Sequence, residues 1–204
     1  MGYLVLNYDW LCQRCLRDHT GKPAGSFRDH VDKCKLPYST PLLRTKGFQV
    51  YCVGPDAPTH ERQFASKSVA LTMHVSHEIG ADEIGWYSKY TAGEKKKLQP
   101  HAFMPTVKGN VAGIVVLMLA PATLVTFPKA GKPKMDKEIS ERWCINRIWI
   151  AAGSRRQGVT TRTIQAIARH LDIAVTDLAW VRPNENGYAL MRSICGDAVY
   201  FAAA

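Results

Sequence analysis

Residues 146–160 read Asn-Arg-Ile-Trp-Ile-Ala-Ala-Gly-Ser-Arg-Arg-Gln-Gly-Val-Thr, and the interpretation of the whole chain starts from them. The apolar residues up to Ile150 are typical of a strand, and a basic turn with Gly153 and Gly158 follows. A helix is expected over about 159–171, because apolar residues recur there with helical spacing. A strand that runs through such a turn into a helix presents free backbone N–H groups and the positive end of the helix dipole. The stretch predicts an anion site suited to a pyrophosphate, with an ordinary loop of solvated arginines as the alternative.

Strand and helix signals alternate from Gly47 to the end of the chain. A polar segment at 81–100 and a basic loop at 128–137 interrupt them, and residues 108–110 are expected to form a tight turn. The lysine run at 95–97 is interpreted as a solvated loop. We expect an α/β sandwich. Its strands are predicted at about 48–53, 101–107, 111–119, 122–127, 144–151, 177–181 and 198–201, and its other helices at about 63–79 and 187–194.

The 204 residues carry a formal net charge of +10, which favours acidic partners such as nucleic acid, an acidic protein surface or a polyphosphate-bearing cofactor. A basic surface that only keeps the protein in solution explains this charge equally well. The apolar stretch from Val111 to Phe127 is short for a transmembrane helix and contains Pro121, so we expect a hairpin that turns near residues 120–121. The N-terminus lacks the features of a secretory signal, and the cysteines beyond position 34 are isolated, which favours a reducing compartment.

Four residues near the N-terminus have the spacing of a zinc site, namely Cys12, Cys15, His30 and Cys34. The Cys-x-x-Cys pair brings two thiolates to one ion, and His30 and Cys34 share one face of an expected helix that Ser26 caps. His19 is a competing ligand outside the helical spacing. Four nitrogen and sulfur ligands leave no open position, so a structural zinc ion is expected rather than a catalytic one.

A family resemblance begins at the basic turn. The pattern Arg155-x-x-Gly158-x-Thr160 resembles the acetyl-CoA pyrophosphate loop of the GNAT acetyltransferases, which reads Gln/Arg-x-x-Gly-x-Gly/Ala, although Thr160 is larger than that pattern allows. Residues 146–150 with the double arginine at 155–156 resemble the Ser-Arg-Ile-Trp-Val…Arg-Arg block of one branch, the sister-chromatid cohesion (Eco1-type) acetyltransferases.

Three further features are similar to the same branch. Residues 177–187 resemble its Glu-Ile-Ala-Phe-Ser-Asp-Pro-Thr-Pro-Asp-Gly block, and Cys195-Gly196 falls where the family also has Cys-Gly. Those proteins carry a Cys-x-x-Cys…His finger just ahead of the catalytic domain. The form of the finger in this chain is also similar to that of MYST-type histone acetyltransferases.

The resemblance implies a GNAT-type fold, a mixed twisted sheet flanked by helices, at 47–204, after a zinc finger at 1–36 and a connector at 37–46. It implies acetyl-CoA as co-substrate, a structural Zn²⁺ and direct attack of an amine on the thioester. The strand at 144–151 would pair with the pantetheine arm, while the turn holds the pyrophosphate. The implied cofactor-binding residues are Ile148, Trp149, Ile150, Arg155, Arg156, Gln157, Gly158, Val159, Thr160 and Thr161.

Two positions depart from the family pattern. The Eco1-type enzymes are expected to have a Glu in the helix after the loop and an Asp before a Pro, where this chain has Gln165 and Arg182. Neither side chain is a general base at neutral pH. The catalytic candidates near the same site are Cys144, Asp177, Glu141 and Tyr188, and the alternatives are a buried packing role for Cys144 and Tyr188 and a surface charge for Asp177.

We therefore expect a nuclear protein lysine N-acetyltransferase that acts on a chromosomal protein, either a cohesin subunit or a histone tail. Its basic surface is expected to favour association with chromatin, and no contact with a membrane is expected. One alternative is a weak or inactive GNAT-fold module that docks a chromatin-associated partner. Another is an acetyltransferase for a small amine such as an aminoglycoside, which leaves the finger unexplained.

Overall fold

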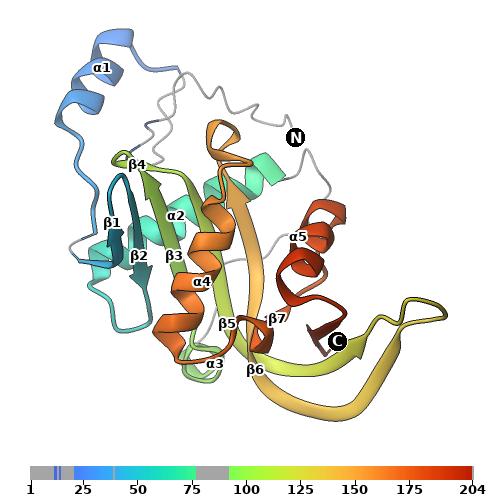
Figure 1. Ribbon diagram of the computed structural model, residues 1–204. Helices are drawn as coiled ribbons and strands as arrows, with labels where there is room; N and C mark the ends of the chain where they lie inside the picture. Colours follow the sequence, from blue (N-terminus) through green and yellow to red (C-terminus); the bar gives the residue numbers. More distant parts are fainter. Residues whose placement is uncertain (1–11, 13, 15–20, 39, 77–91, 204) are drawn as a thin grey trace.

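The computed structural model describes residues 12, 14, 21–38, 40–76 and 92–203 (Figure 1). Its centre is an eight-stranded sheet with the order β1-β2-β3-β5-β6-β7-β8, and β4 pairs with β3 beside this path. Strand β7 runs parallel to β6 and β8, and the other pairings are antiparallel. The strands are β1 (Pro41–Thr45), β2 (Phe48–Val53), β3 (His101–Val107), β4 (Asn110–Val111), β5 (Gly113–Thr126), β6 (Lys134–Ile150), β7 (Ala179–Trp180) and β8 (Ala198–Ala202).

Helices cover both faces of this sheet, which confirms the expected α/β architecture (Figure 1). On one face, α4 (Val159–Leu171) and α5 (Glu185–Cys195) pack on the sheet around Ile164, Ile167 and Met191. On the opposite face, α2 (Thr59–Ser76) packs through Ala65 and Val69. The described residues also form α1 (Ala24–Lys33), α3 (Ala92–Leu98) and the short 3₁₀ turns η3 (Ala152–Ser154) and η4 (Val175–Asp177). No helix among these described segments combines the length and the apolar character that crossing a membrane requires.

The hairpin expected within residues 111–127 is wrong. Strand β5 continues without a turn through Pro121, which lies opposite Glu141 of β6. Proline is tolerated here because the chain needs only its carbonyl group and no N–H at this position. The carbonyl accepts a hydrogen bond from the Ala203 N–H at 2.8 Å. The sequence signal was misread because proline in an apolar run usually ends a strand.

The hairpin partner of β5 is β6, which begins at Lys134, inside the segment expected to be a loop. Strand β8 then pairs with both β7 and β5, so β5, β6, β7 and β8 close into a small ring. One cluster of small buried side chains, Ala122, Cys144 and Ala179, comes from three of the four strands. Closure of the ring determines the position at which β6 and β7 pair.

Several smaller boundaries also differ from the sequence analysis. Residues 41–45 of the expected connector pair with β2 as a strand, and residues 95–97 lie within α3 rather than in a loop. The expected strand at 177–181 is divided into η4 and β7. Helix α1 begins at Ala24 after Pro23, so Ser26 lies within the helix and does not cap it. The tight turn at 108–110 is confirmed, with positive φ at Lys108 and Gly109.

Candidate functional site

Strands β6 and β7 pair over two residues and then separate. Cys144 lies opposite Ala179 and Ile145 opposite Trp180, and the last contact is a hydrogen bond from the Val181 N–H to the Ile145 carbonyl at 3.0 Å. Beyond this point, residues 147–150 of β6 pair with β5 on one edge, and no described strand pairs with their other edge. An extended ligand with amide groups can therefore pair with this edge as a strand does.

The basic turn follows the free edge directly, and two of its side chains brace it. The Arg155 side-chain Nε donates to the Ile150 carbonyl at 3.0 Å, and the Gln157 side-chain amide donates to the Gly153 carbonyl at 2.7 Å. Gly158 has φ +70°, and no atom lies within 4 Å of where a Cβ would stand. The turn thus leaves open space at Gly158 for a ligand to approach the backbone.

Helix α4 begins immediately after this glycine and has no side-chain cap at its N-terminus. The Arg162 N–H donates to the Gly158 carbonyl at 3.0 Å, so the N–H groups of residues 159–161 have no partner within the helix. These groups and the helix dipole favour an anion. The free edge of β6, the open space at Gly158 and this helix N-terminus lie in sequence along one path, which fits an elongated ligand with a phosphate-bearing end.

Asn146 stands where β6 and β7 separate, and the sequence analysis did not single out its side chain. The pairing of β5 with β6 shifts between Val116 and Leu117, so Asn146 has no cross-strand partner. Its side-chain nitrogen lies 3.6 Å from the Met118 sulfur, and its side-chain oxygen is buried without a hydrogen-bond partner. A buried acceptor without a donor is uncommon in native proteins and calls for a specific explanation, such as an ordered water, an ion or a catalytic role. The bulge that exposes this residue depends on register, which the sequence does not show.

Cys144 lies next to the same point but inside the closed ring. Its side chain is fully buried and donates to the Ala120 carbonyl at 3.8 Å. Burial raises the pKa of the Cys144 thiol to about 11, although the hydrogen bond to Ala120 opposes this change. The neutral thiol is therefore the dominant form at neutral pH, and the environment favours packing over a catalytic role.

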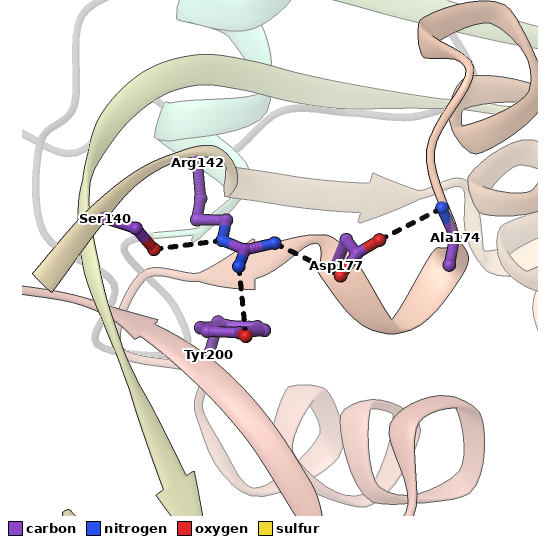
Figure 2. Close-up of polar contacts among 5 residues, drawn as sticks. All are labelled: Ser140, Arg142, Ala174, Asp177 and Tyr200. Atoms are coloured by element: carbon purple, nitrogen blue, oxygen red, sulfur yellow. Dashed lines mark hydrogen bonds and ion pairs between the residues drawn. The ribbon is translucent and has the colours of Figure 1, made fainter. Parts of the chain in front are cut away.

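Asp177 is held in a polar cluster with Arg142, and Figure 2 shows its members. One Arg142 nitrogen lies 3.1 Å from the Asp177 carboxylate, and another donates to the Tyr200 hydroxyl at 3.0 Å. A third donates to the Ser140 hydroxyl at 3.1 Å. The second Asp177 oxygen accepts the Ala174 N–H at 3.3 Å, across the 3₁₀ turn η4. The cluster ties β6, η4 and β8 together, so it supports the ring.

We predict that Asp177→Asn destabilises the fold and leaves the expected acetyltransferase activity largely intact. The amide keeps a hydrogen-bond acceptor but loses the ion pair with Arg142, which is 27% exposed beside a carboxylate that is 41% exposed. Such partly exposed pairs contribute about 1 kcal/mol or less. Urea unfolding should show a loss of that size, and kcat should stay within about twofold, a change of well under 1 kcal/mol in the barrier. A loss of kcat of several hundredfold at unchanged stability would instead make Asp177 a catalytic residue.

The other two catalytic candidates lie apart from the separation point. Glu141 is exposed on β6, opposite Pro121. Tyr188 on α5 is 38% exposed, and its ring packs edge-on against Phe127 with centroids 5.7 Å apart. Gln165 and Arg182 are both exposed, and Arg182 has a positive φ of 33°.

The predicted metal ligands converge as far as the structure describes them. The ligand atoms of Cys12, His30 and Cys34 lie within 4.8 Å of one another, although they are up to 22 positions apart in the chain. Cys15 lies outside the described residues. Arg14, between the two knuckle cysteines, donates to the carbonyls of Val31 at 3.2 Å and Cys34 at 2.9 Å, at the end of α1. Two sulfurs and one imidazole nitrogen at this separation fit a Zn²⁺ ion, whose ligands stand about 2.0–2.3 Å from it.

Comparison with known proteins agrees with this geometry. A family model described as ESCO1/2 acetyl-transferase matches residues 142–203, which contain the separation of β6 and β7, the basic turn, α4 and α5. Over these residues the chain is similar to the Eco1-type acetyltransferases. The match supports an N-acetyltransferase and confirms the resemblance drawn from the sequence.

Solved structures show the same fold. The acetyltransferase domain of xEco2 bound to a K105-CoA conjugate has a TM-score of 0.63 and 15% identity, and the alignment covers 81% of this chain and 99% of that one. A second structure of the xEco2 domain has a TM-score of 0.61 and 14% identity, with 80% and 95% covered. At these identities the likeness concerns the fold of the acetyltransferase. No curated protein sequence matches the chain at a significant level.

Proposed function

We propose that this acetyltransferase transfers the acetyl group of acetyl-CoA to a lysine of a chromosomal protein, either a cohesin subunit or a histone tail. The observation that carries the proposal is the continuous path from the free edge at 147–150 through the turn at Gly158 to the uncapped start of α4. The xEco2 domain, which has this fold, binds a CoA conjugate. A nuclear location and association with chromatin belong to the same proposal.

Residues of this chain account for the binding of acetyl-CoA in two parts. The backbone of 148–150 pairs with the pantetheine amides, and the N–H groups at the start of α4 bind the pyrophosphate with Gly158. Arg155 and Gln157 act mainly by holding the turn in shape, since both donate to its own carbonyls. Arg156, exposed at φ 58°, contributes positive charge. Bound acetyl-CoA supplies a thioester that is reactive toward amines.

Asn146 positions the incoming amine in this proposal. Its unpartnered side-chain oxygen accepts an N–H of the substrate lysine at the point where β6 and β7 separate. An amide oxygen orients an amine but does not take up its proton at neutral pH. The lysine nitrogen forms the new bond to the acetyl carbon, the bond to sulfur breaks, the amine proton passes to water and the thiolate of CoA takes up a proton.

The zinc finger has a structural role in this proposal. Cys12, His30 and Cys34, with Cys15, would hold a Zn²⁺ ion that ties the N-terminal segment to α1, and the ion takes no part in acetyl transfer. Helix α1 has no buried residue, so little else in it provides a core. An acetyltransferase for small amines has no evident use for this module, which favours a macromolecular substrate.

A label-transfer experiment tests the proposal. The full chain is incubated with radiolabelled acetyl-CoA and with purified cohesin subunits, core histones, or an aminoglycoside. We expect label on one of the two protein classes, and reductive methylation of the substrate lysines should abolish it. Label on the aminoglycoside alone, or no label above that of the boiled enzyme on any substrate, would contradict the proposed substrate class.

A further inference from the structure

Below α5 in Figure 1, β5 and β6 run to the end of their hairpin, and β8 pairs with the other edge of β5 as far as Thr126. We call residues 126–140 the β5–β6 arm. No described strand pairs with the outer edge of β6 in this arm, because β7 pairs with β6 only at Cys144 and Ile145. The arm therefore offers an open strand edge, which is a usual place for another chain to bind.

Two large apolar side chains in the arm face water. Met135 is 71% exposed and Ile139 is 62% exposed. Both exposed fractions are larger than that of any other large apolar side chain in the described part of the chain. Met135 lies opposite Val125, and Ile139 lies opposite Thr123. Directly opposed residues of an antiparallel pair project to the same face, so the two apolar side chains lie on one face of the arm.

The arm also carries a concentration of positive charge. Between Phe127 and Ser140 the sequence has two acidic residues and four lysines, all exposed, namely Lys129, Lys132, Lys134 and Lys137. One of the acids, Asp136, accepts the backbone N–H of the other, Glu138, at 3.3 Å. The tip from Phe127 to Met135 contains three of the lysines and no acid. The charge of this surface is complementary to an acidic partner.

Protection of the open edge does not explain the whole pattern. Lysines and a bulge at a strand edge discourage unwanted pairing, and the arm has both, with a shift of register between Thr123 and Val125. Exposed apolar side chains have the opposite effect, because they attract other apolar surfaces. A binding partner that covers the exposed apolar side chains accounts for their presence beside the lysines.

We propose that the β5–β6 arm binds an extended segment of another protein in which acidic residues alternate with aliphatic ones. The aliphatic side chains cover Met135 and Ile139, and the acidic side chains lie against the lysines of the tip. An alternating pattern suits this surface because a strand presents one kind of side chain to each face. This interaction does not require acetyl transfer, so it is tested independently of the proposed function.

The probe is a fluorescein-labelled peptide of twelve residues that alternates glutamate with valine or isoleucine. Two control peptides replace all glutamates by lysine, or all aliphatic residues by serine. Fluorescence anisotropy with the full chain should show saturable binding of the probe and at least about tenfold weaker binding of each control peptide, as expected when both apolar burial and charge contribute. Raising the salt from 50 to 300 mM should weaken the binding of the probe.

Two pairs of substitutions in the arm test where the peptide binds. Met135→Ser with Ile139→Ser removes the apolar contact, and Lys132→Glu with Lys134→Glu reverses the charge. Each pair should weaken binding of the probe about tenfold or more. The matched control, Arg44→Glu with Lys46→Glu, reverses two exposed charges near the β1–β2 turn and should change the affinity by less than about twofold. Circular dichroism and thermal unfolding check that each variant is folded, and either pair alone suffices for the test.

Three outcomes would overturn the proposal. The probe does not bind, or it binds no better than the control peptides, or the arm variants bind it as well as the parent protein does. Sedimentation velocity tests whether the arm instead binds a second copy of this chain. That would be the result if the chain forms dimers, the arm substitutions abolish them and the probe does not compete with them.

Discussion

Gly158→Glu should strongly weaken the binding of acetyl-CoA while the protein stays folded. Gly158 has φ +70°, a conformation that glycine adopts freely and other residues adopt at a cost of about 1–2 kcal/mol. A glutamate there also places negative charge beside the N–H groups at the start of α4, where the pyrophosphate is proposed to bind. Isothermal titration calorimetry should show Kd raised by about 100-fold or more, equivalent to about 2.7 kcal/mol.

The matched control is Gly109→Glu in the turn between β3 and β4. Gly109 has φ +78° and, like Gly158, has no atom within 4 Å of a Cβ position. This substitution therefore introduces the same charge and a similar backbone cost away from the candidate site. It should lower the melting temperature to a similar extent and leave the affinity for acetyl-CoA unchanged. Equal affinities in the two variants would show that the turn at Gly158 does not bind the pyrophosphate.

Cys34→Ser should release the metal and loosen the N-terminal segment. The Cys34 sulfur converges with the ligand atoms of Cys12 and His30, and three ligands hold a structural zinc ion far less tightly than four. Structural zinc contributes about 10–16 kcal/mol to the folding of small finger modules, so little of this one should remain ordered without it. Metal analysis of the purified protein should give about one zinc ion per parent chain and close to none in the variant.

Cys52→Ala is the control for loss of a thiol. Cys52 lies on β2, away from the cluster, and burial raises the pKa of its thiol to about 12. This variant should keep its zinc. Limited proteolysis should cleave the Cys34→Ser variant near α1, while the fragment that contains the sheet resists cleavage and still binds acetyl-CoA. Full zinc content in Cys34→Ser, or loss of acetyl-CoA binding from an intact sheet, would contradict a separate structural finger.

The candidate site could be predicted from the sequence where it depends on neighbours in the chain. The basic turn, Gly158 and the start of α4 follow one another, so their relation is set by local backbone preferences. The same is true of the apolar face of α4, where Ile164, Ile167 and Ala168 are buried as their spacing indicates. The cysteine and histidine spacing is likewise a local pattern, and the ligand atoms of Cys12, His30 and Cys34 lie close together in the structure.

Features that depend on strand pairing could not be predicted in this way. Strand β5 continues through Pro121 with β6 paired on both sides of it, and no local signal encodes that partner. Asp177 is engaged by Arg142, which lies 35 positions earlier in the chain, and the two meet only once the ring of β5, β6, β7 and β8 has closed. Asn146 has an unpartnered oxygen because one residue of β6 is unmatched on β5.

The sequence by itself therefore determined the strand–turn–helix that is proposed to bind the cofactor, the metal-ligand spacing and the resemblance to the Eco1-type acetyltransferases. The tertiary structure alone decided which of the catalytic candidates are engaged elsewhere, and it brought Asn146 to the separation of β6 and β7. It also determined that the side chains of Met135 and Ile139 on the β5–β6 arm are exposed to solvent. The physical reason is that local dihedral and capping preferences act over a few residues, whereas register and burial depend on contacts between segments far apart in the chain.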